Sequence, residues 1–195
     1  MVLGGTIGAA LALEPAQGRS ALADEALMVR YGCGDPDAFD LLYRRHRAGL
    51  HRFLTRLVGG DAEEVFQEVW LAVIRGRRRY RPEARFATWL YTIAHHRAVD
   101  RLRRRGLWRE EEVDGSAPDE TPGPFELTLS GELADALQAA LALLPPPQRA
   151  AFLMQAEGGL SLDEIAEASA VSRETVKSRL RYAGRRLRTA LESYR

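Results

Sequence analysis

The chain has 195 residues, of which 46% are hydrophobic and 28% are charged, so it is long enough for one domain or for two small helical domains. Its longest apolar runs, such as residues 69–74, are far shorter than the roughly 20 residues of a membrane-spanning helix, which excludes an integral membrane protein. Cys33 is the only cysteine, so an internal disulfide and a cysteine-based zinc cluster are excluded, and we expect a reducing, cytoplasmic compartment.

The N-terminal residues are apolar but do not have the order of a secretory signal. No basic segment precedes residues 11–13, and Glu14 and Pro15 follow where small cleavage-site residues would be needed. We therefore expect a flexible N-terminal extension over residues 1–23.

The net charge of +1 conceals three separate blocks of charge. Residues 75–109 carry a net charge of +10, residues 110–135 carry −9, and residues 171–195 carry +6. Either basic block alone fits a solvated helix face. Two basic blocks, each on a predicted helix, favour a polyanion that contacts both.

The hydrophobic pattern repeats every 3.6 residues almost throughout and contains no convincing alternating strand, which predicts an all-α fold. A short helix over about residues 24–33 precedes a long amphipathic helix that Asp35 and Pro36 begin and Gly59 ends. A third helix begins at Asp61, with Glu64 placed for a capping box, and a fourth covers about residues 86–105. These four helices are expected to form a first domain, residues 24–105.

Residues 106–130 are acidic and rich in glycine and proline, a composition that predicts a flexible linker. A second small helical domain, residues 131–193, is expected to follow. Its first helix has a leucine stripe, prolines at 145–147 interrupt it, and a further helix over 148–157 ends at two glycines.

The most specific pattern lies between residues 161 and 188. Ser161 with Glu164 predicts a capping box, residues 169–171 predict a short turn, and Ser172 caps a second helix. The second helix has an apolar side, and its other side presents Arg173, Lys177, Ser178, Arg181, Arg185 and Arg188. This is a helix-turn-helix whose second helix would enter the major groove of DNA; a plain antiparallel helix pair with a basic surface is the alternative.

Taken in order, several segments make the chain resemble a bacterial sigma factor of the compact extracytoplasmic-function (ECF) group, which keeps only regions 2 and 4 of the sigma-70 family. The resemblance covers roughly residues 24–192. The segments that carry it are residues 34–39 (GDPDAF), 62–70 (AEEVFQEVW), 86–94 (FATWLYTIA), 100–104 (DRLRR), 144–149 (LPPPQR), 159–166 (GLSLDEIA) and 175–180 (TVKSRL).

The resemblance implies three contact surfaces. The surface that docks on the clamp helices of the largest polymerase subunit would comprise Glu63, Glu64, Gln67, Glu68 and Trp70. Minus-ten DNA would be read by Arg79, Arg81, Arg85, Phe86, Trp89, His96, Arg97, Asp100, Arg101 and Arg104. Minus-thirty-five DNA would be read by Arg173, Glu174, Lys177, Ser178, Arg181, Tyr182 and Arg185, with Arg149 near the DNA backbone.

The resemblance also implies partners: core RNA polymerase, including the flap of its second-largest subunit, promoter DNA, and an anti-sigma factor. The acidic linker matches the segment that threads the RNA exit path, so it is either an RNA mimic or a spacer extended by self-repulsion. No cofactor, metal, small-molecule substrate or membrane insertion is expected.

Two other functions fit the sequence less well than that of a sigma factor. A stand-alone helix-turn-helix regulator would bind duplex DNA without polymerase, but it leaves the Gln67 helix and the 86–105 segment unexplained. An enzyme is not expected, because the sequence has no phosphate-binding glycine loop and no nucleophile motif, and its four histidines lack metal-ligand spacing.

Overall fold

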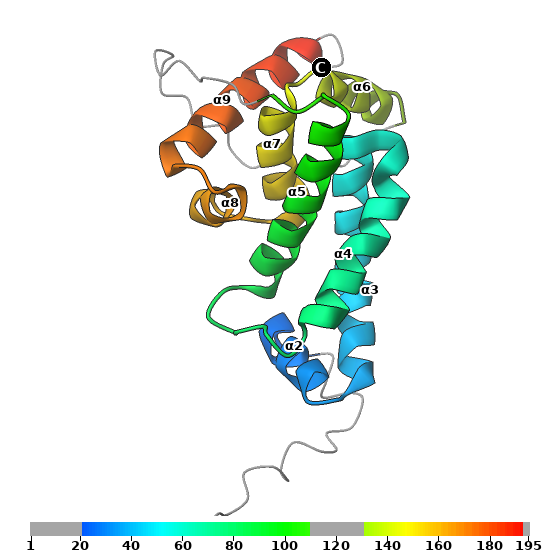
Figure 1. Cartoon of the computed structure of the whole chain (residues 1–195). Coiled ribbons are helices and arrows are strands. Elements are labelled where there is room, and N and C mark those ends of the chain that lie inside the picture. Colours follow the sequence, from blue (N-terminus) through cyan, green and yellow to red (C-terminus); the bar gives the residue numbers. More distant parts are fainter. Residues whose placement is uncertain (1–20, 110–130, 193–195) are drawn as a thin grey trace, which may run out of the picture.

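The computed structural model describes residues 21–109 and 131–192, and within these ranges every regular element is a helix (Figure 1), which confirms the all-α prediction. None of these helices is both long and apolar enough to cross a membrane. The elements in chain order are α2 (Asp24–Gly32), α3 (Pro36–Val58), the 3₁₀ turn η1 (Gly59–Asp61), α4 (Ala62–Gly76), α5 (Phe86–Arg104), α6 (Gly131–Ala142), α7 (Pro146–Gly158), α8 (Leu162–Ser169) and α9 (Arg173–Ala190).

The first half of the molecule consists of the roughly parallel rods α3, α4 and α5, with α2 packed at one end (Figure 1). Each long helix contributes an apolar stripe, as the 3.6-residue period requires. Leu42, Leu50, Val65, Val69 and Leu90 are all fully buried between these helices. The free thiol of Cys33 is exposed just after α2.

Two helix starts differ in detail from the sequence prediction. Asp35 and Asp61 do occupy the N-cap positions of α3 and α4, but neither side chain makes a capping hydrogen bond. Asp61 accepts a hydrogen bond from Arg105 at 2.9 Å, and Glu64 accepts one from Arg101 at 2.8 Å. Both carboxylates bind arginines at the end of α5 instead of the backbone amides at the start of α4, since hydrogen bonds to a charged guanidinium are the stronger ones. The two carboxylates therefore link the start of α4 to the end of α5.

In the second half, α9 packs against α6, α7 and α8. The leucine stripe of α6 continues into the buried residues Leu137, Leu141 and Leu144. Helix α7 begins at Pro146, earlier than predicted. Its two prolines lie in the first turn, where a helix tolerates proline because the amides there have no partner within the helix. Gly159 ends α7 in the left-handed conformation, with φ of 61°, and turns the chain toward α8.

The two halves pack on each other, which the sequence did not predict. Helix α7 lies against α3, and α8 lies against α5 (Figure 1). The buried residues of both halves belong to one continuous apolar cluster. The described helices therefore form a single closed body. Residues 110–130, which make up most of the linker predicted over 106–130, lie outside the described ranges.

Candidate nucleic-acid interface

The helix-turn-helix has the local geometry that its sequence predicted. The amide of Glu164 donates to Ser161 Oγ at 3.3 Å, and the amide of Ser161 donates to Glu164 Oε2 at 2.8 Å, which completes the capping box. Ala170 turns the chain in the left-handed conformation, with φ of 53°. Ser172 then caps α9 by accepting from the amide of Thr175 at 3.1 Å. The caps and the turn together fix the direction in which α9 leaves α8.

Helix α9 is strongly two-sided. Val176, Leu180, Ala183 and Leu187 are buried against the second half. The opposite side holds the residues expected to face DNA, of which Arg173, Glu174 and Arg185 are exposed, whereas Lys177, Ser178, Arg181 and Tyr182 are half-buried.

The ring of Tyr182 lies between two arginines of this face. The guanidinium carbons of Arg181 and Arg185 are 5.3 and 5.1 Å from the ring centroid, within the range of a cation–π contact. Arg149 lies on α7 instead, where it is half-buried, donates to the carbonyl of Ala142 at 3.5 Å, and has a pKa lowered by burial.

Most residues expected to read minus-ten DNA lie on the surface of α5 and of the loop before it. Trp89 is half-buried. The exposed residues are Arg79, Arg81, Arg85, His96, Arg97, Asp100 and Arg104.

Phe86 is the exception on this surface, because its side chain is fully buried. Its ring packs 5.1 Å from the ring of His46, and its amide donates to Glu25 Oε1 at 2.8 Å. Phe86 is therefore a core residue in this structure, and the DNA contact expected of it stays a prediction. Glu25 instead uses this amide to hold α2 against the start of α5.

Arg101, expected to contact minus-ten DNA, is committed within the protein. Its side chain is 15% exposed, and its guanidinium donates to Glu64 at 2.8 Å and to Glu68 at 3.4 Å. The hydrogen bond to Glu64, with the neighbouring charges of Glu64, Asp61 and Glu68, raises the pKa of Arg101. This geometry does not fit a phosphate contact, because the three carboxylates already surround the guanidinium.

The expected polymerase-docking residues lie on α4. Glu63, Glu64 and Gln67 are exposed and Glu68 is half-buried, and Gln67 Nε2 donates to Glu63 Oε1 at 3.3 Å. Trp70 is only 5% exposed, with its ring 4.9 Å from Tyr43. Trp70 is thus a core residue in this structure, and the direct polymerase contact expected of it stays a prediction.

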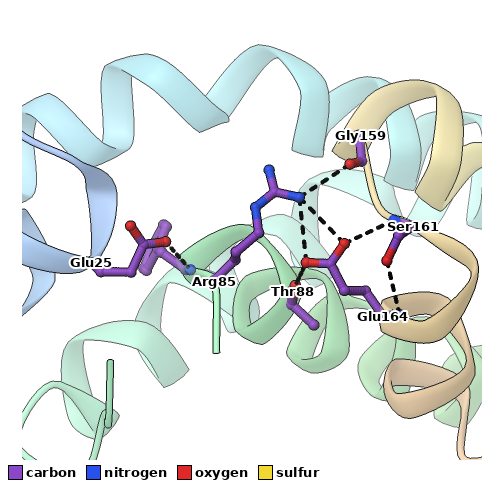
Figure 2. Close-up of polar contacts among 7 residues, drawn as sticks. Glu25, Arg85, Thr88, Gly159, Ser161 and Glu164 are labelled. Atoms are coloured by element: carbon purple, nitrogen blue, oxygen red, sulfur yellow. Dashed lines mark hydrogen bonds and ion pairs between the residues drawn. The ribbon is translucent and has the colours of Figure 1, made fainter. Parts of the chain in front are cut away.

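Two carboxylates, Glu164 and Glu157, make contacts between the halves that the sequence did not predict. Glu164 on α8 accepts from Thr88 Oγ1 at 2.5 Å and from Arg85 Nη1 at 3.3 Å (Figure 2). Glu157 on α7 accepts from Arg52 Nε at 2.7 Å and also from Arg56, both on α3. No local pattern could have indicated these pairs, since the partners lie 76 to 105 residues apart in the chain.

A cavity of about 360 Å³ separates α5 from the turn and second helix of the helix-turn-helix. Its lining includes His96 and Asp100 of α5 and the buried Arg179 of α9. Trp108, which follows α5, also lines it and packs with its ring 5.7 Å from His95. The two expected DNA-reading helices thus face each other across this cavity.

Comparison with known proteins follows the same division of the chain. The family model for sigma-70 region 2 matches residues 42–107, and the model for sigma-70 region 4 matches residues 134–187. The ECF RNA polymerase sigma factor SigM of Mycobacterium tuberculosis is 36% identical over 173 residues, which cover 87% of this chain and 85% of SigM. The chain belongs to the ECF group of RNA polymerase sigma factors.

Other members of the group are similar over most of their length. The RNA polymerase sigma factor CarQ of Myxococcus xanthus is 34% identical, with 84% of this sigma factor and 95% of CarQ covered. The ECF RNA polymerase sigma-E factor of Escherichia coli is 32% identical, with 82% and 89% covered. The protein therefore directs promoter-specific transcription initiation through RNA polymerase, and a stand-alone regulator is not favoured.

Solved structures share the fold of this sigma factor. CnrH, in complex with the cytosolic domain of CnrY, has a TM-score of 0.64 at 22% identity, covering 88% of this chain and 99% of CnrH. The sigma factor RpoE, in complex with the anti-sigma factor NepR from Bartonella quintana, has a TM-score of 0.63 at 23% identity, covering 80% and 98%.

Proposed function

We propose that α9 reads the minus-thirty-five element of the promoter. Its residues Arg173, Lys177, Ser178, Arg181 and Arg185 offer the donors that reach guanine O6 and N7 or DNA phosphates in the major groove. The single observation that carries this proposal is the fully capped helix-turn-helix, in which Ser161, Glu164 and Ser172 present the start of α9 outward. Glu174 and Tyr182 lie on the same face, and Tyr182 supports the two arginines that flank it.

We propose that the minus-ten element is bound by α5 and by the arginine-rich loop before it. An unstacked base needs an aromatic surface, and the phosphates beside it need cations. The half-buried ring of Trp89 and the exposed side chains of Arg79, Arg81, Arg85 and Arg97 meet those needs. His96, Asp100 and Arg104 continue this surface toward the end of the helix.

We propose that the exposed acidic side of α4 docks on the clamp helices of the largest polymerase subunit. Glu63, Glu64 and Gln67 are accessible there, and a surface of carboxylates and amides suits a basic partner. Arg101 already neutralises part of the negative charge of Glu64 and Glu68. Glu63 and Gln67 are therefore the residues most available to contact the polymerase.

The remaining assignments are proposals on family grounds. We propose a region 2 unit over residues 24–105, a linker over 106–130, a region 4 unit over 131–193 that also contacts the polymerase flap, and an extension over 1–23. The linker is an RNA mimic or a spacer, and residues 110–130 and 1–20 lie outside the described ranges. We also propose a cytoplasmic location, which fits this role. Control by an anti-sigma factor is proposed because the structural neighbour RpoE was solved in complex with the anti-sigma factor NepR.

Run-off transcription tests the proposal directly. Purified core polymerase is supplied with the DNA upstream of the gene for this protein, with and without the sigma factor. Discrete transcripts that depend on the protein are expected, and mapping their starts would give the two promoter elements. Tight binding to duplex DNA without any binding to core polymerase would contradict the proposal and favour the stand-alone regulator.

A further inference from the structure

The cavity between α5 and the helix-turn-helix is lined mainly by side chains of the kinds that bind anions and aromatic rings. Its volume of about 360 Å³ lies within the usual range of small-molecule pockets, about 300–1,000 Å³. One wall is the second half of α5 with Trp108 beyond it. The other wall is the turn after α8 with the side chain of Arg179 on α9. The cavity therefore has room for one small ligand.

Two arginines line this cavity, one from each wall. Arg179 is only 4% exposed, so the surrounding protein holds its guanidinium in place. Arg103, near the end of α5, is exposed. A guanidinium group donates hydrogen bonds in a planar fork that matches the oxygens of a phosphate. A phosphate group inside the cavity would therefore meet donors from both walls.

An aromatic surface belongs to the same lining. The ring of Trp108 is half-buried and packs against the buried ring of His95, with 5.7 Å between the ring centroids and 76° between the ring planes. This edge-to-face contact fixes the position of the indole at the cavity wall. Because every nucleobase has a π face, any of them can stack on such a ring.

Asp100 is the one acidic residue among the described residues that line the cavity, and it is exposed. An ionised carboxylate only accepts hydrogen bonds. It therefore suits a ligand that carries donors as well as phosphates, as the hydroxyl groups of a ribose and the amino group of a purine do. Ser169, whose hydroxyl can donate or accept, lies at the same cavity. Phosphate, ring and donors occur together in a nucleotide.

We propose that this cavity is a binding site for a purine nucleoside diphosphate. The phosphates lie between Arg103 and Arg179. The base stacks on Trp108, and the ribose hydroxyls or the amino group of the base donate to Asp100. The site is independent of the promoter assignments made for α5 and α9, so its failure would leave the proposed function intact.

Isothermal titration calorimetry of the full-length protein with ADP and with GDP tests the site, in the absence of magnesium so that the phosphates keep their full charge. One nucleotide is expected to bind per protein molecule. Adenosine and pyrophosphate are each expected to bind at least about tenfold more weakly than ADP, since each keeps only part of the contacts. Absence of saturable binding for both nucleotides overturns the site. Pyrophosphate that binds as tightly as ADP overturns the assignment to a nucleotide.

The variants R103A and R104A form a matched pair. Both remove one positive charge from adjacent exposed positions at the end of α5, but Arg104 does not line the cavity. R103A is expected to weaken ADP binding about tenfold, and R104A less than about twofold. Equal losses in the two variants would show attraction to the basic surface in general and would overturn the site.

The variant W108L tests stacking, because it keeps an apolar side chain at a half-buried position. It is expected to weaken ADP binding about tenfold and to leave pyrophosphate binding unchanged. Thermal unfolding without nucleotide verifies that each variant is folded, and the rise in Tm with ADP gives a second measure of binding. Wild-type affinity of W108L for ADP overturns the stacking of the base on Trp108.

A short oligo-deoxyadenylate distinguishes a free nucleotide from a nucleic-acid strand as the source of the ligand. The oligonucleotide is expected not to displace ADP from the protein. An oligonucleotide that displaces ADP, and that binds R103A more weakly than R104A, would assign the cavity to a strand and overturn the free nucleotide.

Discussion

The guanidinium of Arg101 donates to the carboxylate of Glu64 at 2.8 Å and thereby ties α5 to α4. Glu68 and Asp61 lie close enough to share the same cation. A residue in the most basic segment of the chain thus serves the fold of the first half rather than standing free for DNA.

Replacing Arg101 with alanine is expected to lower the thermal stability of the protein by a few degrees. The substitution leaves three neighbouring carboxylates without their shared cation, so they repel one another. Differential scanning fluorimetry of R101A and of R104A measures this, since Arg104 is exposed on the same helix. Equal melting temperatures for the two variants would contradict a structural role for Arg101.

Lys177 and Arg181 are expected to determine minus-thirty-five selectivity. Each good base contact is worth about 1–3 kcal/mol, so K177A or R181A should reduce discrimination between promoter variants by about 5- to 150-fold. Run-off transcription on templates with single minus-thirty-five substitutions measures the ratio.

Arg188 is the comparison for a phosphate contact on α9. R188A is expected to weaken transcription on all templates alike. It should also reduce the slope of the logarithm of the DNA-binding constant against the logarithm of the salt concentration by about one. The same loss of selectivity in R188A as in K177A would contradict the division of α9 into base and phosphate contacts.

Substituting Ser172 by alanine is expected to destabilise the second half by about 1 kcal/mol, because the amide of Thr175 loses its hydrogen-bond acceptor at the start of α9. Urea unfolding of S172A measures the change in the free energy of unfolding. S172T serves as the control, since threonine also caps helices, and it should retain most of the wild-type stability.

The pair between Asp24 and His46 predicts an acid-sensitive contribution to stability. The hydrogen bond from His46, at 2.6 Å, and then that from Arg45 hold the pKa of Asp24 below its ordinary value of 3.8. A lowered carboxyl pKa stabilises the folded state above the ordinary value, and the contribution is lost as the pH falls through the folded-state pKa. Wild type should therefore be more stable than D24N at pH 7, and the difference should shrink below about pH 4 in urea titrations.

Features determined by neighbouring residues could be predicted from the sequence. The capping box of Ser161 and Glu164 and the cap of Ser172 depend on residues three positions apart, so their geometry follows from local chemistry. The helix over 86–105 was predicted within one residue of α5.

Orientation and long-range pairing could not be predicted in the same way. The family pattern placed Phe86 and Trp70 in functional segments but did not say that both side chains point into the core. The net charge of residues 75–109 gave no sign that Arg101 is paired, because its carboxylate partners lie more than 30 residues away along the chain. Glu164 was recognised as a helix cap alone, although the same carboxylate also binds Thr88.

The two roles of Glu164 are chemically separable, and this has a genetic consequence. A glutamate codon becomes a glutamine codon by one base change, and glutamine preserves the helix cap while it removes the charge that pairs with Arg85. One base change can therefore weaken the ion pair between α8 and α5 while it leaves the start of the recognition helix intact. The contact between the two halves and the local fold of the helix-turn-helix can thus change independently of each other.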